Sequence, residues 1–305
     1  MIKKDSRLKR EYAAYRIMRA LIAPVPLLLV QWAGSLSGFF FLLFHRRRRV
    51  IFFNLKKAFP GKSLFSRFRI AVRTAMHFGK IALEFIKLAG MNERRIGKLT
   101  RIHDIHHLQD ALSDGRGAFI LSGHFGNWEI TAQAIAISGF PQMMVHRPLD
   151  NPYLECELSK IRRRFGNELI PKKNATRNML KALGEGRLID IVIDQHVPEE
   201  MGVVVPFLSL PTPTTPSLAI LSMRSGAPVV PIVSRPRGRG YDIFFQKPIR
   251  PKDGSDEVQL TTEFNDFLTG EIMKTPHLWL WFHDRWGHFK RKSKKGGGTE
   301  VKGED

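Results

Sequence analysis

The sequence feature that most constrains the fold is residues 117–139, GAFILSGHFGNWEITAQAIAISG. Its apolar start, residues 118–121, is typical of a buried strand, and the residues after Asn127 are typical of a helix. Asn127 is a preferred helix N-cap, so the helix is predicted to begin at Trp128. Gly123 and Gly126 allow the backbone to bend between the two elements. The stretch therefore predicts a strand-turn-helix unit.

The turn brings together two residues that can act as a base and its orienting partner. His124 and Glu129 are five positions apart, which leaves them about 140° apart on a regular helix, too far to touch. They can meet when His124 lies in the turn and Glu129 in the first helical turn. Glu129 would then accept the proton of one imidazole nitrogen, and the other nitrogen would remove a proton from a hydroxyl. No G-x-S-x-G motif supplies that hydroxyl, so it is expected to belong to a substrate. From spacing alone, a structural role for the two residues is the more common outcome.

After this unit, strand and helix candidates alternate, which predicts an α/β fold with a mostly parallel central sheet flanked by helices. Ligand sites of such sheets collect at the carboxyl ends of the strands. His124, Arg147 and Asp194 all follow predicted strands, so we expect them around one crevice. The predicted strands are 142–146, 188–194, 228–234 and 241–246, and the predicted helices are 152–165, 175–183, 217–225 and 256–273.

The N-terminal region predicts attachment to a membrane. Residues 1–19 are basic, residues 20–44 carry no charge, and four arginines at 46–49 follow. An uninterrupted helix over that uncharged run would measure about 37 Å, enough to cross a bilayer. Pro24 and Pro26 argue against one straight helix, so the segment either spans the membrane or lies in one leaflet. We therefore divide the chain into a basic N-terminus and anchor (1–45), a catalytic domain (46–289) and a disordered, charged tail (290–305).

The formal charge of +21 requires an acidic partner, for which nucleic acid, anionic lipid and an acidic carrier protein all qualify. The chain has no zinc-finger or helix-turn-helix signature, and an uncharged anchor does not suit a nucleic-acid-binding protein. Cys156 is the single cysteine, which excludes an internal disulfide and a cysteine zinc site. No carboxylate or thiolate completes a metal site around His103, His106 and His107, so no metal is expected.

The string HFGNWE, with His-x-x-x-x-Glu after an apolar strand, resembles the motif of the bacterial lipid A biosynthesis acyltransferases. These belong to the wider glycerolipid acyltransferase superfamily, whose motif more often has Asp at the position of Glu129. The similarity extends to Arg49 and Asn54-Leu55, to an arginine about forty residues after His124, and to Asp194-Gln195. It ends at WFHDRW, residues 281–286, whose side chains we interpret as anchoring the C-terminal segment to the core rather than as catalytic.

The resemblance implies transfer of a fatty acyl group from an acyl carrier protein thioester to a hydroxyl of a lipid A precursor, a phosphorylated lipid. It also implies the cytoplasmic face of the bacterial inner membrane, with no metal and no redox cofactor. His124 would be the general base, oriented by Glu129, and a backbone N–H near Gly126 or Asn127 would hold the oxyanion. The remaining substrate-binding candidates are Arg163, with Arg162 and Arg164 as close alternatives, Arg147, and the supporting Asp194.

Other functions stay open at this stage. The acceptor could be a phosphatidylinositol mannoside or a lysophospholipid, and the donor could be a coenzyme A thioester. Ser209 and Thr212 stand where the family more often has Gly and Ala, which leaves the acceptor and the chain length undecided. A catalytically silent basic protein that binds membrane or nucleic acid, and a hydrolase that releases free fatty acid, are the alternatives from other classes.

Overall fold

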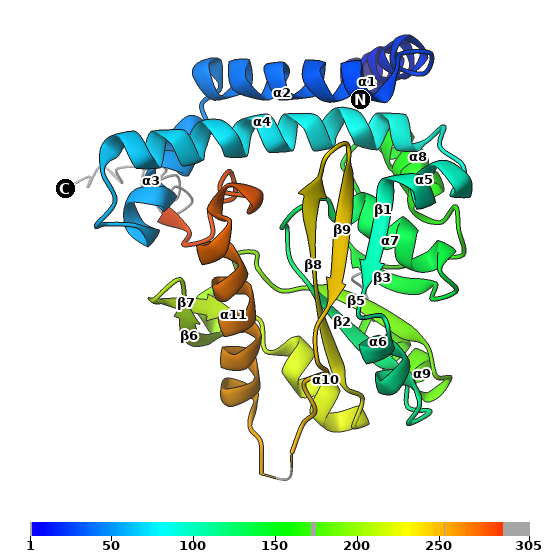
Figure 1. The fold of residues 1–305 in the computed structure, drawn as a ribbon, viewed down its shortest axis with the longest axis vertical. Helices are drawn as coiled ribbons and strands as arrows, with labels where there is room; N and C mark the ends of the chain where they lie inside the picture. Colours follow the sequence, from blue (N-terminus) through cyan, green and yellow to red (C-terminus); the bar gives the residue numbers. More distant parts are fainter. Residues whose placement is uncertain (1, 172–174, 253, 289–305) are drawn as a thin grey trace, which may run out of the picture.

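The protein is built on one seven-stranded sheet that is parallel except at one pair. A computed structural model describes residues 2–171, 175–252 and 254–288 (Figure 1). The strand order is β1-β9-β8-β2-β5-β3-β4, and β8 and β9 are the antiparallel pair. The expected α/β class with a mostly parallel sheet is confirmed. The strands are β1 (Thr100–His103), β2 (Ala118–Ser122), β3 (Gln142–His146), β4 (Glu168–Pro171), β5 (Leu188–Val192), β8 (Val229–Arg237) and β9 (Gly240–Phe245).

Helices cover both faces of this sheet because its central strand is apolar on both sides. All five residues of β2 are buried, with Phe119 and Leu121 in one core cluster and Ala118 and Ile120 in the other. The first cluster includes α9 (Ala175–Gly184), α10 (Ser217–Ser225) and α11 (Glu257–Lys274). The second includes α5 (Glu93–Leu99), α6 (His106–Leu112), α7 (Trp128–Ile137) and α8 (Pro152–Arg162). Such two-sided burial is typical of strands in parallel sheets.

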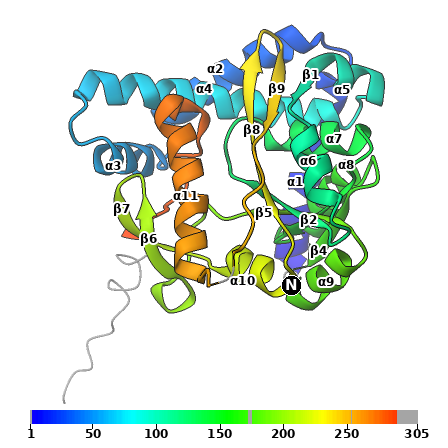
Figure 2. The ribbon, with the colours of Figure 1, turned by 60° about the horizontal axis from the view of Figure 1, so that its bottom comes forward.

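The N-terminal helices form a further layer across one end of the sheet. In Figures 1 and 2, α2 (Leu27–Phe44) lies beside α4 (Leu64–Leu88), and α3 (Arg48–Ala58) follows at one end of the pair. A Cβ on Gly38 would overlap the carbonyl oxygen of Ala75, and one on Gly79 would overlap that of Gly34. The two helices therefore pack backbone against backbone, a contact that only glycine permits here.

The uncharged run of residues 20–44 is divided between two helices, and the break lies at Pro24 and Pro26. The helix α1 (Ile2–Ile22) ends before Pro24, and α2 begins at Leu27 after Pro26. Of the helices in the described part of the chain, α2 is the one long and apolar enough to cross a membrane. The proline-bearing turn explains the break, because proline disfavours helix both at its own position and at the preceding residue.

The other local predictions were confirmed unevenly. The structure has β3 and α10 where they were expected, and α8, α9, β5, β8, β9 and α11 differ by a few residues at their ends. The following elements were not predicted: the strands β1 and β4, the hairpin strands β6 (Val203–Phe207) and β7 (Leu210–Thr214), and two short 3-10 helices at Glu199–Met201 and Pro276–Leu278. The predicted tail at 290–305 lies outside the described residues.

Candidate active site

The turn between β2 and α7 has the predicted geometry. The strand ends at Ser122, His124 lies in the turn, and the side chain of Asn127 accepts a hydrogen bond from the Ile130 N–H as the N-cap of α7. Gly126 has a φ of 64°, and a Cβ there would overlap the backbone of Ser234. Glycine at this position thus allows the turn to pack directly against β8.

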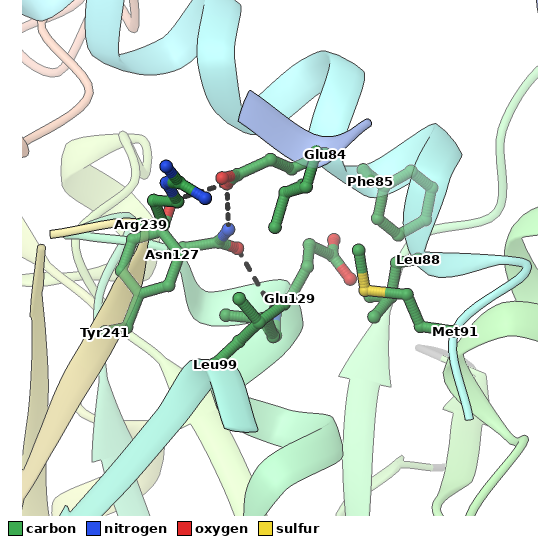
Figure 3. Close-up of a pocket in the computed structure, with 11 residues that line it drawn as sticks. Glu84, Phe85, Leu88, Met91, Leu99, Asn127, Glu129, Arg239 and Tyr241 are labelled. Carbon is green, nitrogen blue, oxygen red and sulfur yellow. Dashed lines mark hydrogen bonds between the residues drawn. The ribbon is translucent and has the colours of Figure 1, made fainter. Parts of the chain in front are cut away.

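Asn127 is itself held by a buried carboxylate on α4. Its Nδ2 donates to Glu84 Oε2 at 2.9 Å, and the Tyr241 hydroxyl donates to the same oxygen (Figure 3). Burial raises the pKa of Glu84, while Lys80 and the three hydrogen-bond donors around it act in the opposite direction. The buried Glu84 therefore ties the N-terminus of α7 to the helical layer above the sheet.

The partner of His124 is Asp194, which follows β5. The imidazole Nδ1 lies 2.8 Å from Asp194 Oδ1, and the backbone N–H of His124 donates to Oδ2 at 2.7 Å. Trp279 Nε1 also donates to Oδ2, at 2.8 Å. An ionised aspartate at Nδ1 fixes the imidazole tautomer and leaves Nε2 free to accept a proton. The expectation that Glu129 orients His124 is therefore wrong, because Asp194 occupies that place.

The pair is strongly polarised. Burial alone would lower the pKa of His124, but the charge and hydrogen bond of Asp194 outweigh it, and the net pKa is raised. Burial alone would raise the pKa of Asp194, but His124 and the hydrogen bond from Trp279 lower it to about 2. Asp194 is therefore ionised at any physiological pH, and it stabilises the imidazolium that forms when His124 accepts a proton.

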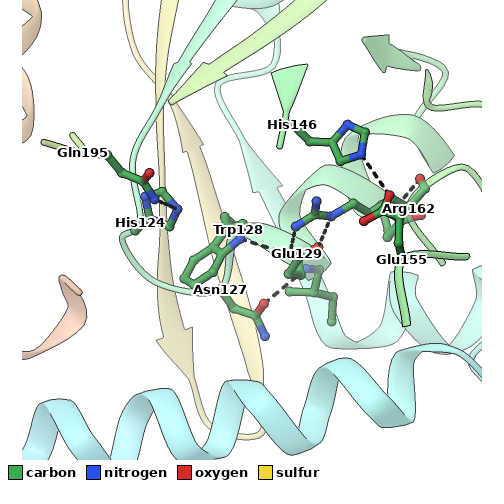
Figure 4. A network of polar contacts seen from close by, with 10 residues as sticks. His124, Asn127, Trp128, Glu129, His146, Glu155, Arg162 and Gln195 are labelled. Atoms are coloured by element: carbon green, nitrogen blue, oxygen red, sulfur yellow. Dashed lines mark hydrogen bonds and ion pairs between the residues drawn. The ribbon is translucent and has the colours of Figure 1, made fainter. Parts of the chain in front are cut away.

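Glu129 binds Arg162 of α8. Arg162 Nε donates to Oε2 at 3.1 Å and Nη2 to Oε1 at 2.5 Å, a bidentate pair, and Trp128 Nε1 donates to Oε1 at 3.2 Å. In Figure 4, Trp128 lies between His124 and Glu129. The side chain of Glu129 thus extends toward α8, away from the imidazole.

The other arginines expected to bind substrate lie differently. Arg163 is exposed at the end of α8, and the side chain of Arg147 is 84% exposed. Arg164 donates to the carbonyls of Leu88 and Ala89 at the end of α4. Arg162, the neighbour named as a close alternative to Arg163, is the arginine that pairs with Glu129.

A third carboxylate near the site was missed by sequence analysis. Asp190 lies in the middle of β5 and accepts a hydrogen bond from the Ser122 hydroxyl at 2.5 Å. Burial raises its pKa to about 6, although Ser122 and Arg162 act in the opposite direction. An aspartate inside the apolar string LIDIVID was the available signal, because a buried carboxylate is rarely placed there without a partner.

The Nε2 atom of His124 is covered by an exposed side chain rather than by the core. The exposed Gln195 places its Nε2 3.1 Å from it (Figure 4). With Nδ1 protonated toward Asp194, the Gln195 amide donates and His124 Nε2 accepts. Rotation of this surface side chain would open the nitrogen to a substrate hydroxyl.

The expected oxyanion donors are engaged elsewhere. The N–H of Gly126 donates to the Leu278 carbonyl and that of Asn127 to the Ser234 hydroxyl, both at 2.9 Å. Neither of these two N–H groups is therefore available to an oxyanion. Within the described residues, the N–H groups of Trp128 and Glu129 at the start of α7 donate to no protein acceptor. These are the N–H groups that a helix N-terminus offers to an anion.

A cavity of about 620 Å³ lies beside the turn, between α2, α4 and the segment after α11. Its wall continues to the site through aromatic contacts: the Phe78 ring is 6.0 Å from that of Trp128, which is 5.2 Å from the His124 ring. Its size is within the range of small-molecule sites. The cavity is lined by Ser37, Gly38, Phe41, His45, Arg47, Ala75, Phe78, Gly79, Ala82, Leu280, Phe282 and His283.

The C-terminal motif is held in the core, as its interpretation as an anchor requires. Trp281 and Arg285 are fully buried, and Arg285 donates to the Pro213 carbonyl and the Thr214 hydroxyl. Asn54 of α3 donates to the carbonyls of Trp281 and His283. The tryptophan that reaches the site is Trp279, two residues before the motif recognised in the sequence.

The three histidines considered as metal ligands, His103, His106 and His107, do not form a metal site in the described residues. His103 lies 3.1 Å from Asp242 on the edge of the sheet. In residues 2–171, 175–252 and 254–288, no group of three His, Cys, Asp or Glu side chains is placed to hold a metal ion.

Comparison with known proteins settles the family. The model of the bacterial lipid A biosynthesis acyltransferases matches residues 1–288. The chain belongs to this family. It is 28% identical to a lipid A biosynthesis acyltransferase of Haemophilus influenzae over 76% of this chain and 75% of that one. It is 27% identical to the lipid A biosynthesis lauroyltransferase of Escherichia coli over 76% of each chain.

Two further comparisons extend beyond lipid A. A phosphatidylinositol mannoside acyltransferase of Mycolicibacterium smegmatis is 25% identical over 67% of each chain. The crystal structure of the 1-acyl-sn-glycerophosphate acyltransferase PlsC from Thermotoga maritima covers 80% of this chain and 97% of that one, with 14% identity and a TM-score of 0.39. The family match and the named relatives show that the protein is an acyltransferase.

The pair of Arg162 and Glu129 is expected to contribute to stability as well as to the site. Arg162→Met should lower the free energy of unfolding by about 2 kcal/mol or more, because it leaves a buried carboxylate without its bidentate partner. Chemical denaturation measures the change.

The double variant Arg162→Met/Glu129→Leu should recover most of the loss, since no unpaired charge then remains. Arg163→Met, one residue along on the exposed surface, is the matched control and should change stability by less than about 0.5 kcal/mol. Equal losses in the two single arginine variants would contradict the assignment.

Proposed function

We propose that this acyltransferase moves a fatty acyl chain from an acyl carrier protein thioester to a hydroxyl of a lipid A precursor or related glycolipid. The observation that carries the proposal is the His124–Asp194 pair beside an apolar cavity. A base with a free Nε2 suits the activation of a hydroxyl, and the neighbouring cavity suits an acyl chain. The named relatives supply the acceptor class.

In the reaction, Nε2 of His124 removes the proton of the acceptor hydroxyl while its oxygen attacks the thioester carbonyl carbon. Asp194 stabilises the resulting imidazolium. The negative oxygen of the tetrahedral intermediate is held by the N–H groups of Trp128 and Glu129 at the start of α7. Collapse of the intermediate forms the new ester and breaks the carbon–sulfur bond, and the imidazolium returns its proton to the leaving thiolate.

Charged residues around the site suit an anionic acceptor and donor. Arg162 pairs with Glu129 in the first turn of α7. The exposed Arg147, Arg163 and Arg164 lie before and after α8 in the sequence. Guanidinium groups bind phosphates, and the net charge of +21 attracts an acidic carrier protein or an anionic membrane. We place the catalytic domain at the cytoplasmic face of the inner membrane.

The test is acyl transfer by the purified protein. A radiolabelled acyl carrier protein thioester is offered together with a lipid A precursor in detergent micelles, and the lipid products are separated and analysed by mass spectrometry. We expect a new ester on the precursor. Free fatty acid as the sole product would identify a hydrolase, and no turnover with any acceptor would overturn the proposal. An acyl coenzyme A arm distinguishes the two thioester donors.

A phosphatidylinositol mannoside is the second candidate acceptor, because a relative of similar identity has that name. Parallel assays with this lipid and with a lysophospholipid decide among the acceptors. A kcat/KM for either that exceeds the value for the lipid A precursor would replace the acceptor and leave the mechanism unchanged.

The cavity predicts how acyl chain length is selected. Ala82 is a small, exposed residue of α4 in the cavity wall. Ala82→Phe would fill part of the space, so we expect the preferred chain to become shorter, with kcat/KM for the original donor falling about 10-fold or more. Competition among thioesters of different lengths measures the preference.

Ala33→Phe is the matched control for that substitution. Ala33 is exposed on α2 and does not line the cavity. It should leave the length preference unchanged. The same shift in both variants, or in neither, would argue against this cavity as the acyl site.

A further inference from the structure

One face of α2 is apolar and exposed in the described part of the chain. Its exposed large side chains recur at the spacing of one helical stripe: Leu29, Trp32, Leu36, Phe40 and Phe44, with exposed fractions of 56%, 71%, 56%, 48% and 80%. Isolated exposed apolar residues are ordinary, but a continuous stripe of this kind marks an interaction surface.

The opposite face of α2 is fixed to the domain. Gly34 and Gly38 pack against the backbone of α4, and the buried Gln31 donates to Glu84 at 2.6 Å and to the Arg239 carbonyl at 2.8 Å. These contacts connect α2 to the carboxylate that holds Asn127 at the active site. Separation of α2 from α4 would break these buried hydrogen bonds and leave polar groups unpaired, which is unfavourable in free energy.

This attachment argues against a helix that crosses the membrane. Because α4 lies beside α2, a crossing α2 would bring α4 into the hydrocarbon with it, including the exposed Arg69 and Arg73. Charged side chains within the hydrocarbon region are unfavourable, by up to about 3 kcal/mol each at its centre on insertion scales. The 18 residues of α2 span about 27 Å, which is at the short end of the lengths that cross a hydrocarbon core.

A second apolar cluster continues the surface beyond the end of α2. Phe52 of α3 stacks on Phe68 of α4 with ring centroids 6.3 Å apart, and both are exposed, as are Leu64 and Phe65. Phe68 stands seven residues, or about two helical turns, before Ala75, so it lies on the same face of α4 that meets α2. Both clusters therefore belong to one side of the helical layer.

Exposed basic residues connect the two clusters along the chain. Arg46, Arg48 and Arg49 are exposed in the connection from α2 into α3. Arginines beside an apolar surface match the phosphates of an anionic leaflet, whose headgroups lie just outside the acyl chains. The charge complementarity selects a membrane surface over an apolar protein partner.

We propose that α2 lies in the plane of one leaflet of an anionic bilayer, together with the cluster Phe52, Leu64, Phe65 and Phe68, and does not cross it. The side of α2 that holds Phe41 also borders the cavity beside His124. If α2 lies in the plane of the leaflet, this cavity lies at the depth of the lipid molecules of that leaflet. This last consequence rests on the proposed function, whereas the orientation of α2 does not.

Depth-dependent quenching tests the orientation. The full-length protein is mixed with vesicles of one part phosphatidylglycerol to three parts phosphatidylcholine, with bromine atoms at shallow or deep positions of the acyl chains. Trp32 is the exposed tryptophan of α2 and serves as the first probe. The second probe is Phe40→Trp in a Trp32→Phe background, and Trp32→Phe alone gives the signal of the other tryptophans.

An in-plane helix places both probes at the same depth, about 5–10 Å below the headgroups. A crossing helix separates them by about 12 Å, since eight residues lie between them. Equal depth is the expected result. A depth difference near that of a crossing helix, or no quenching of either probe, would overturn the proposal.

Vesicle co-sedimentation tests the second cluster. Phe65→Asp and Phe68→Asp should each weaken binding to these vesicles about 10-fold, and 0.5 M salt should weaken it further. Val258→Asp, at an exposed apolar position of α11, is the matched control and should bind as the unmodified protein does. If all variants bind equally and their melting temperatures are unchanged, the cluster is not part of the membrane-binding surface. This assay contains no substrate and does not depend on catalysis. A protein that binds the vesicles but transfers no acyl group would therefore contradict the proposed function and not the membrane orientation.

Discussion

Replacing His124 with alanine is expected to lower kcat/KM for acyl transfer by about 100-fold to 10,000-fold, the range typical of a lost general base. The imidazole is the group whose Nε2 is directed away from Asp194 and toward the surface, where Gln195 covers it. A residual rate is expected to remain, because the N–H groups of α7 and the cavity would still bind the reacting groups. Single-turnover transfer from a radiolabelled thioester measures the loss.

Two controls separate catalysis from folding in that experiment. His106→Ala removes an exposed histidine of α6, away from the turn, and should keep the full rate. His124→Gln retains a polar side chain beside Asp194 and should fold as the unmodified protein does while remaining slow. A well-folded His124 variant with a near-normal rate would remove this residue from the mechanism.

The local part of the site was predictable because its signals are local. The apolar run, the two glycines and the N-cap Asn127 lie within ten residues of one another, and together they determine where β2 ends and α7 begins. The strand-turn-helix unit, with His124 in the turn, was therefore confirmed.

The partner of His124 was not predictable in the same way. Asp194 is 70 residues away in sequence and reaches His124 because β5 pairs with β2 in the sheet. Spacing offered Glu129 as the nearer carboxylate, and only the sheet order shows that Glu129 faces α8. The sequence also left open which of Arg162, Arg163 and Arg164 faces Glu129, since adjacent residues of a helix differ in direction by about 100°.

The orientation of the apolar N-terminal segment in the membrane also could not be predicted from the sequence. A stripe of large apolar residues on α2 is compatible with a crossing helix and with one lying in a leaflet. The decisive feature is the backbone contact of Gly34 and Gly38 with α4, which begins 20 residues after α2 ends. Glycines within an apolar run give no sign of which helix they meet.

Asp194→Asn is expected to reduce kcat/KM by about 100-fold to 10,000-fold and to change its pH dependence. The base must be neutral to accept a proton, so the rate falls as pH falls through the pKa of His124. Burial lowers that pKa, and the charge of Asp194 raises it above the usual value. Removal of that charge leaves burial opposed only by the smaller effect of Glu129, so the pKa of His124 falls and the acidic limb of the profile should move to lower pH. Rates of single-turnover transfer between about pH 5 and 9 measure both effects.

The same measurement distinguishes the two carboxylates near His124. Glu129 also raises the pKa of His124, but only through its charge, so Glu129→Gln should move the acidic limb in the same direction by less. Asp242→Asn alters a carboxylate paired with His103 at the edge of the sheet and should leave the profile unchanged. If Glu129→Gln moves the limb further than Asp194→Asn does, then Glu129 and not Asp194 controls the imidazole, and the pairing seen in the structure is not the one used in catalysis.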